Sequence, residues 1–256
     1  MRKFLLSRGG RGSKTSLPFQ PTVQQTVSGS SALLQASRNG YLSQVKYLVE
    51  ERHVDPHSCE DEAKLSPLHF ASAFGRLDIV RYLVEERNCH TECRNKFGST
   101  PLHLAAVGGR LGTVKYLINE GGCDPMCRGR NGWTPLHCAC KGGRLDTVKY
   151  LIEEKNVDSS CQAKDGILPL HIASSNGHLP VVKLLVEDYH CNPGVKDKSG
   201  TTPGELAQRK GHVEISSYLS SMEKAVPSEA SPYFIPEDTS LLRESEDASH
   251  EEVEGM

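Results

Sequence analysis

The segment GWTPLHCAC, residues 132–140, holds three side chains that could do chemistry: His137, Cys138 and Cys140. Zinc favours such ligands, and a thiol near an imidazole is the starting point of catalysis by a cysteine nucleophile. Both chemistries require the side chains to converge on one point. Whether they converge depends on the element that holds them, and the rest of the chain identifies that element.

Four segments of the chain begin almost alike at intervals of 34 residues. They read SPLHFASAFGRL, TPLHLAAVGGRL, TPLHCACKGGRL and LPLHIASSNGHL, and they start at Ser66, Thr100, Thr134 and Leu168. TPGELAQRKGHV follows in phase at residue 202, and SALLQASRNGYL precedes at residue 31, offset by one extra residue. Self-similarity at such a period is typical of a solenoid, in which stacked repeats share one continuous core.

These segments resemble the ankyrin repeat family, whose TPLH-x-A pattern recurs in phase over residues 31–223. The resemblance implies an all-α solenoid of stacked helix-turn-helix units joined by hairpin loops. Its six repeats would span 31–65, 66–99, 100–133, 134–167, 168–201 and 202–223. The usual period of the family is about 33 residues. We therefore expect the extra residue where the second helix runs into the loop, as in NEGGCDP at 119–125.

Local signals agree with short paired helices. Thr100 and Thr134 stand before a proline that suits the first helical position, and their hydroxyls can cap free amide hydrogens. Leu168 lacks this hydroxyl, which predicts a cost of about 1 kcal/mol and a stabilising effect of Leu168→Thr. The first repeat has Leu34 where the histidine recurs, and the last repeat has Glu205. We expect these altered ends to act as caps.

The repeat gives the histidine of the opening segment a structural interpretation. The resemblance implies that this histidine bonds to nearby backbone and to a threonine hydroxyl, here that of Thr100 or Thr134, and so ties the repeats together. The recurring histidines are His69, His103, His137 and His171.

The cysteines of the opening segment also have counterparts that do no chemistry. Cys138 occupies the position of large apolar residues, and Cys140 occupies that of Ser or Ala, so we expect both to pack. A zinc site at the doubled C-x-x-x-C motif, 89/93 and 123/127, stays open. Equivalent positions of stacked helices lie about 8–10 Å apart, however, which is too far to share one ion. We expect neither catalysis nor a cofactor.

Charge divides the chain into three parts. Residues 1–30 hold five basic residues and no acid, residues 224–256 hold nine acids against Lys224 and Arg243, and the whole chain has a formal net charge of −2, so the body is neutral. These ends predict two disordered arms, 1–30 and 224–256, around a folded body. Without an apolar run that suits a membrane span or a secretory signal, the nine cysteines indicate a cytoplasmic or nuclear protein with reduced thiols. The basic start leaves mitochondrial import open.

The resemblance also implies a binding surface, because ankyrin-like arrays bind macromolecules through the hairpin tips and the exposed face of the first helices. Basic residues recur at the tips from the third repeat onward, and aromatic residues lie near them. The candidate positions are Lys96, Arg130, Lys164 and Lys198 at the tips; Arg94, Arg128 and Lys196 two residues earlier; Phe74 and Lys141 at first-helix ends; and Phe97 and Trp133 on the hairpins.

We predict a monomeric adaptor that binds other proteins through an acidic or phosphorylated segment, with Trp133 as a central anchor. The tips contrast with the second helices, where basic residues precede acids by four positions. These pairs are Lys46/Glu50, Arg81/Glu85, Lys149/Glu153 and Lys183/Glu187.

Other interpretations stay open. Basic tips are also explained as solubilising side chains, and Trp133 as packing against the next hairpin. A binder of nucleic acid or another polyanion would use the same basic residues, but a body without net charge makes nucleic acid the less favoured partner. The array could also be a structural spacer with function in its tails, or the acidic tail could dock on the basic hairpins.

Overall fold

The computed structural model describes residues 28–59 and 62–225, and the structural statements below refer to these residues. They form six helix pairs and no strand. The pairs are α1 (Gly29–Asn39) with α2 (Leu42–Glu50), α3 (Pro67–Phe74) with α4 (Leu77–Arg81), α5 (Pro101–Gly108) with α6 (Leu111–Asn119), α7 (Pro135–Gly142) with α8 (Leu145–Lys149), α9 (Pro169–Ser175) with α10 (Leu179–Lys183), and α11 (Pro203–Arg209) with α12 (Val213–Ala225).

The terminal helices extend slightly beyond the predicted repeats. α1 begins at Gly29 rather than at residue 31, and α12 ends at Ala225 rather than at residue 223. Gly29 and Ser30 therefore belong to the first repeat and not to the predicted arm. The rest of the two predicted arms, residues 1–27 and 226–256, lies outside the described residues.

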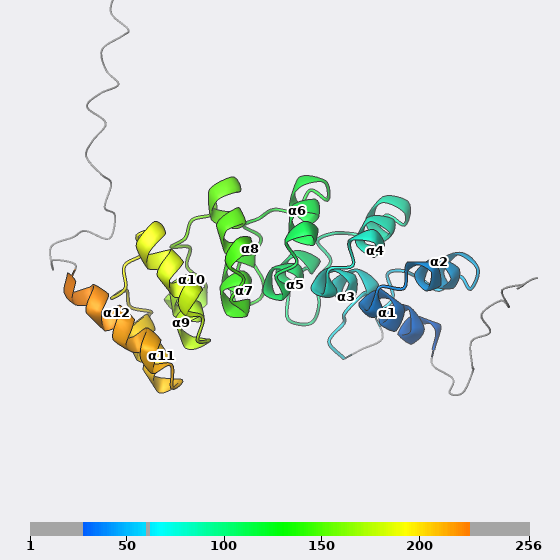
Figure 1. Cartoon of the computed structure of the whole chain (residues 1–256). Coiled ribbons are helices and arrows are strands. Elements are labelled where there is room, and N and C mark those ends of the chain that lie inside the picture. Colours follow the sequence, from blue (N-terminus) through cyan, green and yellow to red (C-terminus); the bar gives the residue numbers. More distant parts are fainter. Residues whose placement is uncertain (1–27, 60–61, 226–256) are drawn as a thin grey trace, which may run out of the picture.

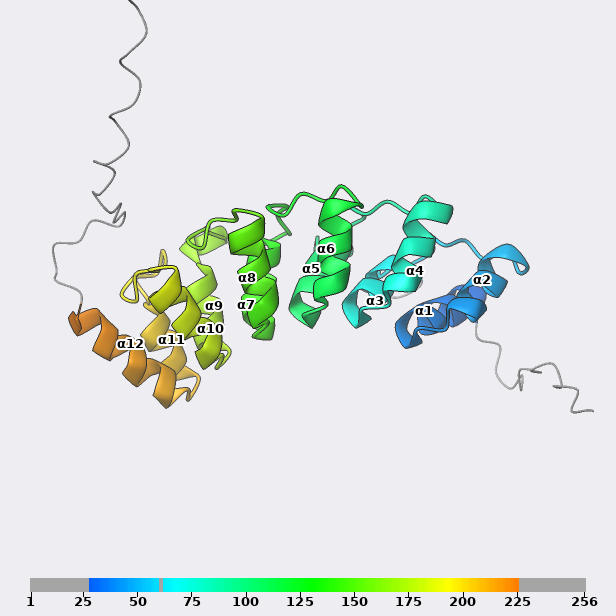
Figure 2. The same ribbon diagram turned by 45° about the horizontal axis from the view of Figure 1, so that its top comes forward.

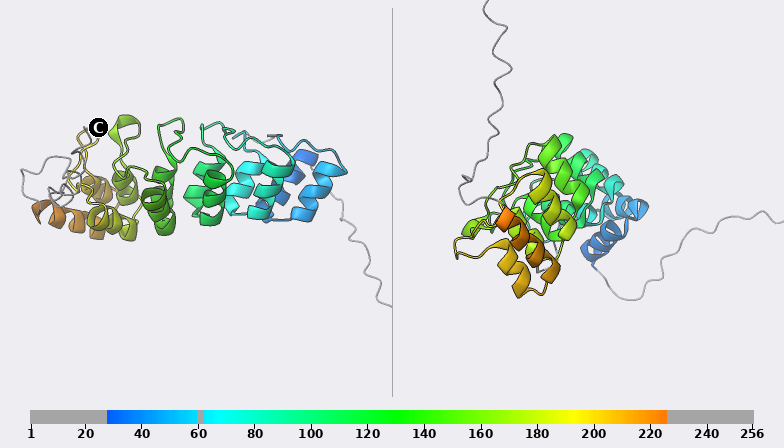
Figure 3. Two further views of the ribbon diagram at one scale, coloured as in Figure 1. Left: turned by 90° about the horizontal axis from the view of Figure 1, so that it is seen from above. Right: turned by 60° about the vertical axis from the view of Figure 1, so that its left-hand side comes forward.

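The pairs stack side by side into an all-α solenoid. Figures 1 and 2 show an arc in which the first helices lie on the inner side and the second helices on the outer side. Figure 3 shows the pairs in one row, with the connecting loops gathered along one edge. Each first helix packs on the first helix of the next repeat, from α1 on α3 to α9 on α11. The buried residues form a single core along the array, including Leu68, Leu102, Leu136 and Leu170.

The ends of the first helices α1, α3, α5 and α7 are each held by a side chain from the following repeat. Gly109 adopts φ +68°, and a Cβ there would lie 2.5 Å from Cδ of Arg144. Only glycine leaves room for the arginine to cross the helix end. The Nε of Arg144 then donates to the carbonyl of Val107 at 3.0 Å. Equivalent bonds run from Arg76 to Arg38, from Arg110 to Ala73 and from His178 to Lys141.

The second helices end in a wider turn where the sequence predicts an extra residue. Three of them continue into π-helical turns: η1 (Tyr82–Glu86), η2 (Tyr150–Glu154) and η4 (Leu184–Asp188). A π-helical turn takes up one residue more than an α-helical turn. The chain then passes through a left-handed residue, such as Asn88 at φ +52° or Asn156 at φ +51°. Asparagine tolerates this conformation better than most side chains do.

One position of the first helices buries a hydroxyl without need. Ser37, Ser72 and Ser174 are fully buried at equivalent positions, and their hydroxyls have no hydrogen-bond partner in the described part of the chain. Ala106 and Cys140 fill the same position in the third and fourth repeats. The position therefore requires a small side chain and not a polar one.

Replacing Ser72 by alanine should stabilise the array. The substitution removes a buried hydroxyl that lacks a partner, which is worth about 1 kcal/mol in free energy of unfolding. Urea unfolding followed by circular dichroism measures the change. The control is Ser66→Ala, which removes a hydroxyl that accepts from the amide of His69 and should cost about 1 kcal/mol. An unchanged or lower stability of Ser72→Ala would contradict this account of the position.

Candidate functional site

His137 of the opening segment is fully buried and binds backbone on both sides of its ring. Its Nδ1 accepts from the amide of Thr134 at 3.3 Å and lies 2.9 Å from the Thr134 hydroxyl. Its Nε2 faces the carbonyl of Ile167 at 3.2 Å. Because a carbonyl only accepts and the Thr134 amide only donates, these contacts assign a neutral ring with the proton on Nε2. The imidazole thus joins the start of one first helix to the residue that precedes the next.

The other recurring histidines make the same connection to the following repeat. His69 faces the carbonyl of Ser99 at 3.2 Å, His103 that of Trp133 at 3.0 Å, and His171 that of Thr201 at 3.2 Å. The hydroxyl of Thr100 lies 2.9 Å from Nδ1 of His103. The histidines therefore form an internal row of cross-repeat bonds.

Sequence reasoning missed that a thiol joins three of these histidines. Cys93, Cys127 and Cys161 lie 3.8–3.9 Å from Nδ1 of His69, His103 and His137, respectively. The Cys161 sulfur also lies 3.6 Å from the Thr134 hydroxyl. A constant spacing of 24 residues from histidine to cysteine in three repeats was the available signal.

These thiol–imidazole contacts have the wrong ionisation for a nucleophile. Burial raises the pKa of the Cys127 thiol to about 11 and lowers the pKa of its partner His103. In the next repeat, burial raises the pKa of the Cys161 thiol and lowers the pKa of its partner His137 to about 4. A reactive cysteine needs a depressed pKa beside a protonated partner. The contacts therefore favour a neutral thiol and a neutral ring, which suits packing with weak hydrogen bonds.

The remaining cysteines show no convergent ligand set. Cys138 and Cys140 are buried in α7, and burial raises the pKa of the Cys138 thiol to about 12. No disulfide joins any two of the nine cysteines. Among the residues described, no three His, Cys, Asp or Glu side chains gather as metal ligands would.

The hairpin tips present four exposed cations in a row. Lys96, Arg130, Lys164 and Lys198 are all exposed, and none forms an ion pair with a described acid. Backbone bonds fix successive tips to one another. The amide of Lys96 donates to Ala63 at 2.9 Å, that of Lys164 to Asn131 at 3.0 Å, and that of Lys198 to Asp165 at 2.9 Å.

Two arginines of the predicted surface act within the array. Arg94 donates through one guanidinium nitrogen to the carbonyls of Gly98 and Arg128, at 2.9 and 2.8 Å. Arg128 does the same to Gly132 and Gln162, at 3.1 and 2.7 Å. Each arginine thus clamps its own hairpin to the next. Lys196 is exposed at the equivalent position of a later hairpin.

The aromatic residues differ in exposure from their predicted order. Phe97 is 62% exposed on its hairpin, whereas Trp133 is half-buried against the core. The Trp133 ring stacks near His137, with centroids 6.3 Å apart, and the ammonium of Lys141 lies 5.4 Å from its centroid. Phe74 lies beneath the guanidinium of Arg38 at 5.0 Å. Of these three aromatic side chains, Phe97 is therefore the one most open to a partner.

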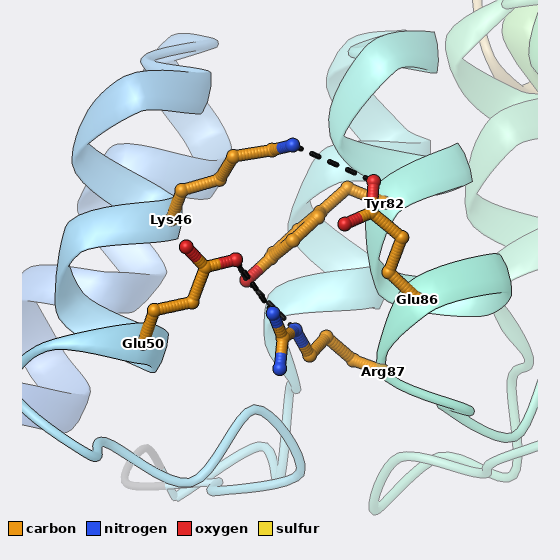
Figure 4. Close-up of polar contacts among 5 residues, drawn as sticks. All are labelled: Lys46, Glu50, Tyr82, Glu86 and Arg87. Atoms are coloured by element: carbon orange, nitrogen blue, oxygen red, sulfur yellow. Dashed lines mark hydrogen bonds and ion pairs between the residues drawn. The ribbon is translucent and has the colours of Figure 1, made fainter.

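The outer side of the array is joined by a different set of contacts. In Figure 4 the ammonium of Lys46 reaches across to Glu86, and Glu50 meets Arg87 and the hydroxyl of Tyr82. Lys46 also lies 4.9 Å from the centre of the Tyr82 ring. A cation of one repeat thus lies over the tyrosine ring of the next repeat, and an acid of the first repeat accepts from the tyrosine hydroxyl.

This tyrosine contact recurs along the second helices. Arg81 lies over Tyr116, Lys115 over Tyr150 and Lys183 over Tyr218. The corresponding hydroxyls donate to Glu85, Asn119 and Glu187. Of the four pairs with a basic residue four positions before an acid, only Arg81–Glu85 forms an ion pair within its helix, at 3.2 Å. Most of the other charges in these pairs turn toward the neighbouring repeat.

The comparisons with known families agree with this architecture. A family described as ankyrin repeats (3 copies) matches residues 85–161, and one described as ankyrin repeats (many copies) matches residues 57–105 and 154–207. The chain belongs to the ankyrin repeat family. Ankyrin repeats commonly mediate protein–protein interaction and are typically non-enzymatic binding modules. A search of curated proteins finds no match to this ankyrin repeat protein. In the part described, no helix has the length and apolar character to cross a bilayer.

The buried histidines should make the stability of this ankyrin array depend on pH. Burial lowers the pKa of His103, His137 and His171 below the ordinary value. Between the folded and unfolded pKa values the unfolded chain binds more protons, so stability is complete above about pH 6.5 and falls as pH falls toward 4. His137 alone would contribute roughly 3 kcal/mol to that loss. Urea titrations at pH 8, 7, 6 and 5 measure it.

The matched variant for this pH experiment is His137→Gln. Glutamine does not titrate, so the variant should start less stable and lose less stability between pH 7 and 5 than the native chain does. A native stability that stays constant from pH 8 to 5 would contradict the neutral tautomer assigned here.

Burial reverses the expectation for Leu168. Its side chain is only 6% exposed, so Leu168→Thr removes apolar burial as well as adding a hydroxyl. Losing a buried leucine costs about 1.5–3 kcal/mol, against a gain of about 1 kcal/mol from the cap. We now expect Leu168→Thr to lower the urea midpoint. Leu168→Thr/Val195→Cys rebuilds the threonine, histidine and cysteine trio around His171 and should recover part of the loss; a single variant more stable than the native chain would restore the first prediction.

Proposed function

We propose that this protein is a non-enzymatic adaptor that binds an acidic segment of a partner protein along its hairpins and first helices. The supporting observation is a contrast in the use of charge. Lys46, Arg81, Lys115 and Lys183 of the second helices meet acids or tyrosines, whereas the four tip cations meet no described acid. Four unpaired cations in a row attract a ligand of opposite charge.

The repeat spacing suggests the form of the ligand. Neighbouring repeats lie about 10 Å apart, and an extended chain advances about 3.3 Å per residue. A partner with an acidic residue at every third position would therefore place one carboxylate at each tip. Phosphorylated serines at the same spacing would serve as well. Asp165 beside Lys164 reduces the positive charge locally, so the strongest attraction is expected near Lys96 and Arg130.

Phe97 is the aromatic anchor of the proposed surface. Its ring is exposed next to Lys96, and aromatic side chains flanked by charge contribute strongly to interfaces. Trp133, which the sequence favours for this role, supplies a half-buried wall instead. Its contact with Lys141 keeps that cation at the surface of α7.

We propose that the adaptor works in the cytoplasm or nucleus. Its nine cysteines, seven of them buried, form no disulfide with one another, which suits a compartment that keeps cysteines reduced. The buried trios serve the stacking of repeats in this proposal and take no part in a reaction.

A labelled peptide with glutamate at every third position tests the proposal. Fluorescence polarisation should show binding to the native chain, and Arg130→Glu/Lys164→Glu should weaken it at least tenfold because two attractions become repulsions. Phe97→Ala should also weaken binding to a peptide that has a leucine between the acids. The matched control is Lys149→Glu, which reverses a charge on the outer side without a described partner and should leave the affinity unchanged.

Three outcomes would count against an acidic protein partner. One is a peptide that binds the double variant as well as it binds the native chain. Another is an affinity that is the same at 50 and 500 mM salt, because screening must weaken charge attraction. Bulk RNA that displaces the peptide with a steeper salt dependence would favour a polyanion ligand instead.

A further inference from the structure

The contact between neighbouring second helices joins a pair of side chains of the earlier repeat to a tyrosine of the later repeat. The pair, here called the cation–acceptor pair, consists of a cation and, four residues on, an acid or amide that accepts from the tyrosine hydroxyl. Tyr82, Tyr116 and Tyr150 make this contact and are only 2–3% exposed. Figure 4 shows the first of these contacts, with Lys46 and Glu50 as the pair and Tyr82 as the tyrosine.

The first repeat has the tyrosine of this contact although no described repeat precedes it. Tyr47 stands at the position of Tyr82 and is 50% exposed. Tyr41 stands at the position of Arg76, and Tyr41 is 57% exposed. In the second to fifth repeats the side chain at this position crosses the end of the preceding first helix. No described cation or acid meets either ring. Two large aromatic side chains thus remain open at one end of the stack.

The last repeat treats its outward end differently. Ser217 and Ser221 replace the cation and the acid that Lys183 and Glu187 supply one repeat earlier. The Ser221 hydroxyl donates to the carbonyl of Tyr218 within its own helix. The last repeat therefore lacks the cation–acceptor pair, whereas the first repeat has the tyrosine. A capping function explains the serines, but it does not explain two exposed tyrosines, because a cap presents a polar outer face.

We propose that the open end of α2, formed by Tyr41 and Tyr47, docks a helix of a partner protein that bears a lysine or arginine and, four residues on, a glutamate or aspartate. The docked helix continues the stack, with its cation over Tyr47 and its acid accepting from the Tyr47 hydroxyl. This end is separate from the hairpin surface, so the inference does not depend on the proposed function.

The chemistry of the contact selects this occupant. A second copy cannot continue the stack head to tail with the same contact, because its last repeat offers Ser217 and Ser221. Residues 1–27 of the chain contain cations, but no acid or amide stands four residues after any of them, so they cannot supply the pair. A helix with both charges four positions apart presents them on one face, as α2 does with Lys46 and Glu50.

A helix-stabilised, labelled peptide that copies residues 42–54 serves as the probe, because it contains the cation–acceptor pair Lys46 and Glu50. Polarisation measurements should show that it binds the full chain. Replacing its lysine and glutamate by serine, as in the last repeat, should weaken binding at least tenfold, and Tyr47→Ser in the protein should do the same. Tyr47 is exposed, so circular dichroism should confirm an unchanged fold.

The control variant is Phe97→Ser, which removes an equally exposed aromatic residue from the hairpin surface and should leave binding of this probe unchanged. Failure of the hairpin proposal would alter only the glutamate-peptide experiment, so the two are distinguishable. Equal binding of the native and serine peptides, or no binding at 500 µM, would overturn the inference. So would protection of the Tyr47 ring from a soluble paramagnetic agent in the free full chain, or self-association that Tyr47→Ser abolishes, because another occupant would then cover the face.

Discussion

The structure depends on side chains that donate to backbone carbonyls of a neighbouring repeat. Each buried histidine reaches forward from its Nε2, as His137 does to Ile167. The residue at the start of four of the second helices reaches back, as Arg144 does to Val107. Carbonyls are present whatever the side chain, so these bonds fix neighbouring repeats without dictating the residues at the surface. No helix pair buries its apolar face alone, and the bonds hold the pairs in the register that buries it.

This division leaves the hairpin tips free to serve binding. Their backbone is fixed twice, by bonds between hairpins such as Lys96 to Ala63 and by clamps such as Arg94. Their side chains point outward without a structural duty, and a row of cations costs the fold little because the tips are exposed. A pre-organised row also reduces the entropy that a partner must lose when it binds. The same carbonyl bonds that stabilise the array therefore prepare its surface for recognition.

Comparison of equivalent positions explains what the sequence could predict. The helix pairs recur along the chain, and the turn glycines and buried histidines recur as the same residue type at equivalent positions. A single sequence therefore shows several times which residue type each of these positions requires. The packing role of Cys138 followed from Phe70, Leu104 and Ile172 at its position. Contacts between repeats were harder to predict, because the partners lie some 24–40 residues apart and the sequence shows a residue's type but not its direction.

The misplaced expectations share that physical cause. Lys46 has Glu50 four residues on, yet its ammonium turns to Glu86 and lies over the Tyr82 ring, whose hydroxyl donates to Glu50. The sequence suggests that the Arg94 side chain is available to a partner, but its guanidinium donates to two carbonyls of the hairpins. Trp133 lies along α7 because the helix that follows it offers His137 and Lys141 to its ring. In each case a side chain long enough to cross between repeats did so, whereas the exposed Phe97 and the short-range cap of Ser66 behaved as their local sequence indicates. The two ends of the array follow the same logic: a residue that crosses between repeats is satisfied only where a neighbour exists, and Tyr47 lacks a described neighbour while Ser217 requires none.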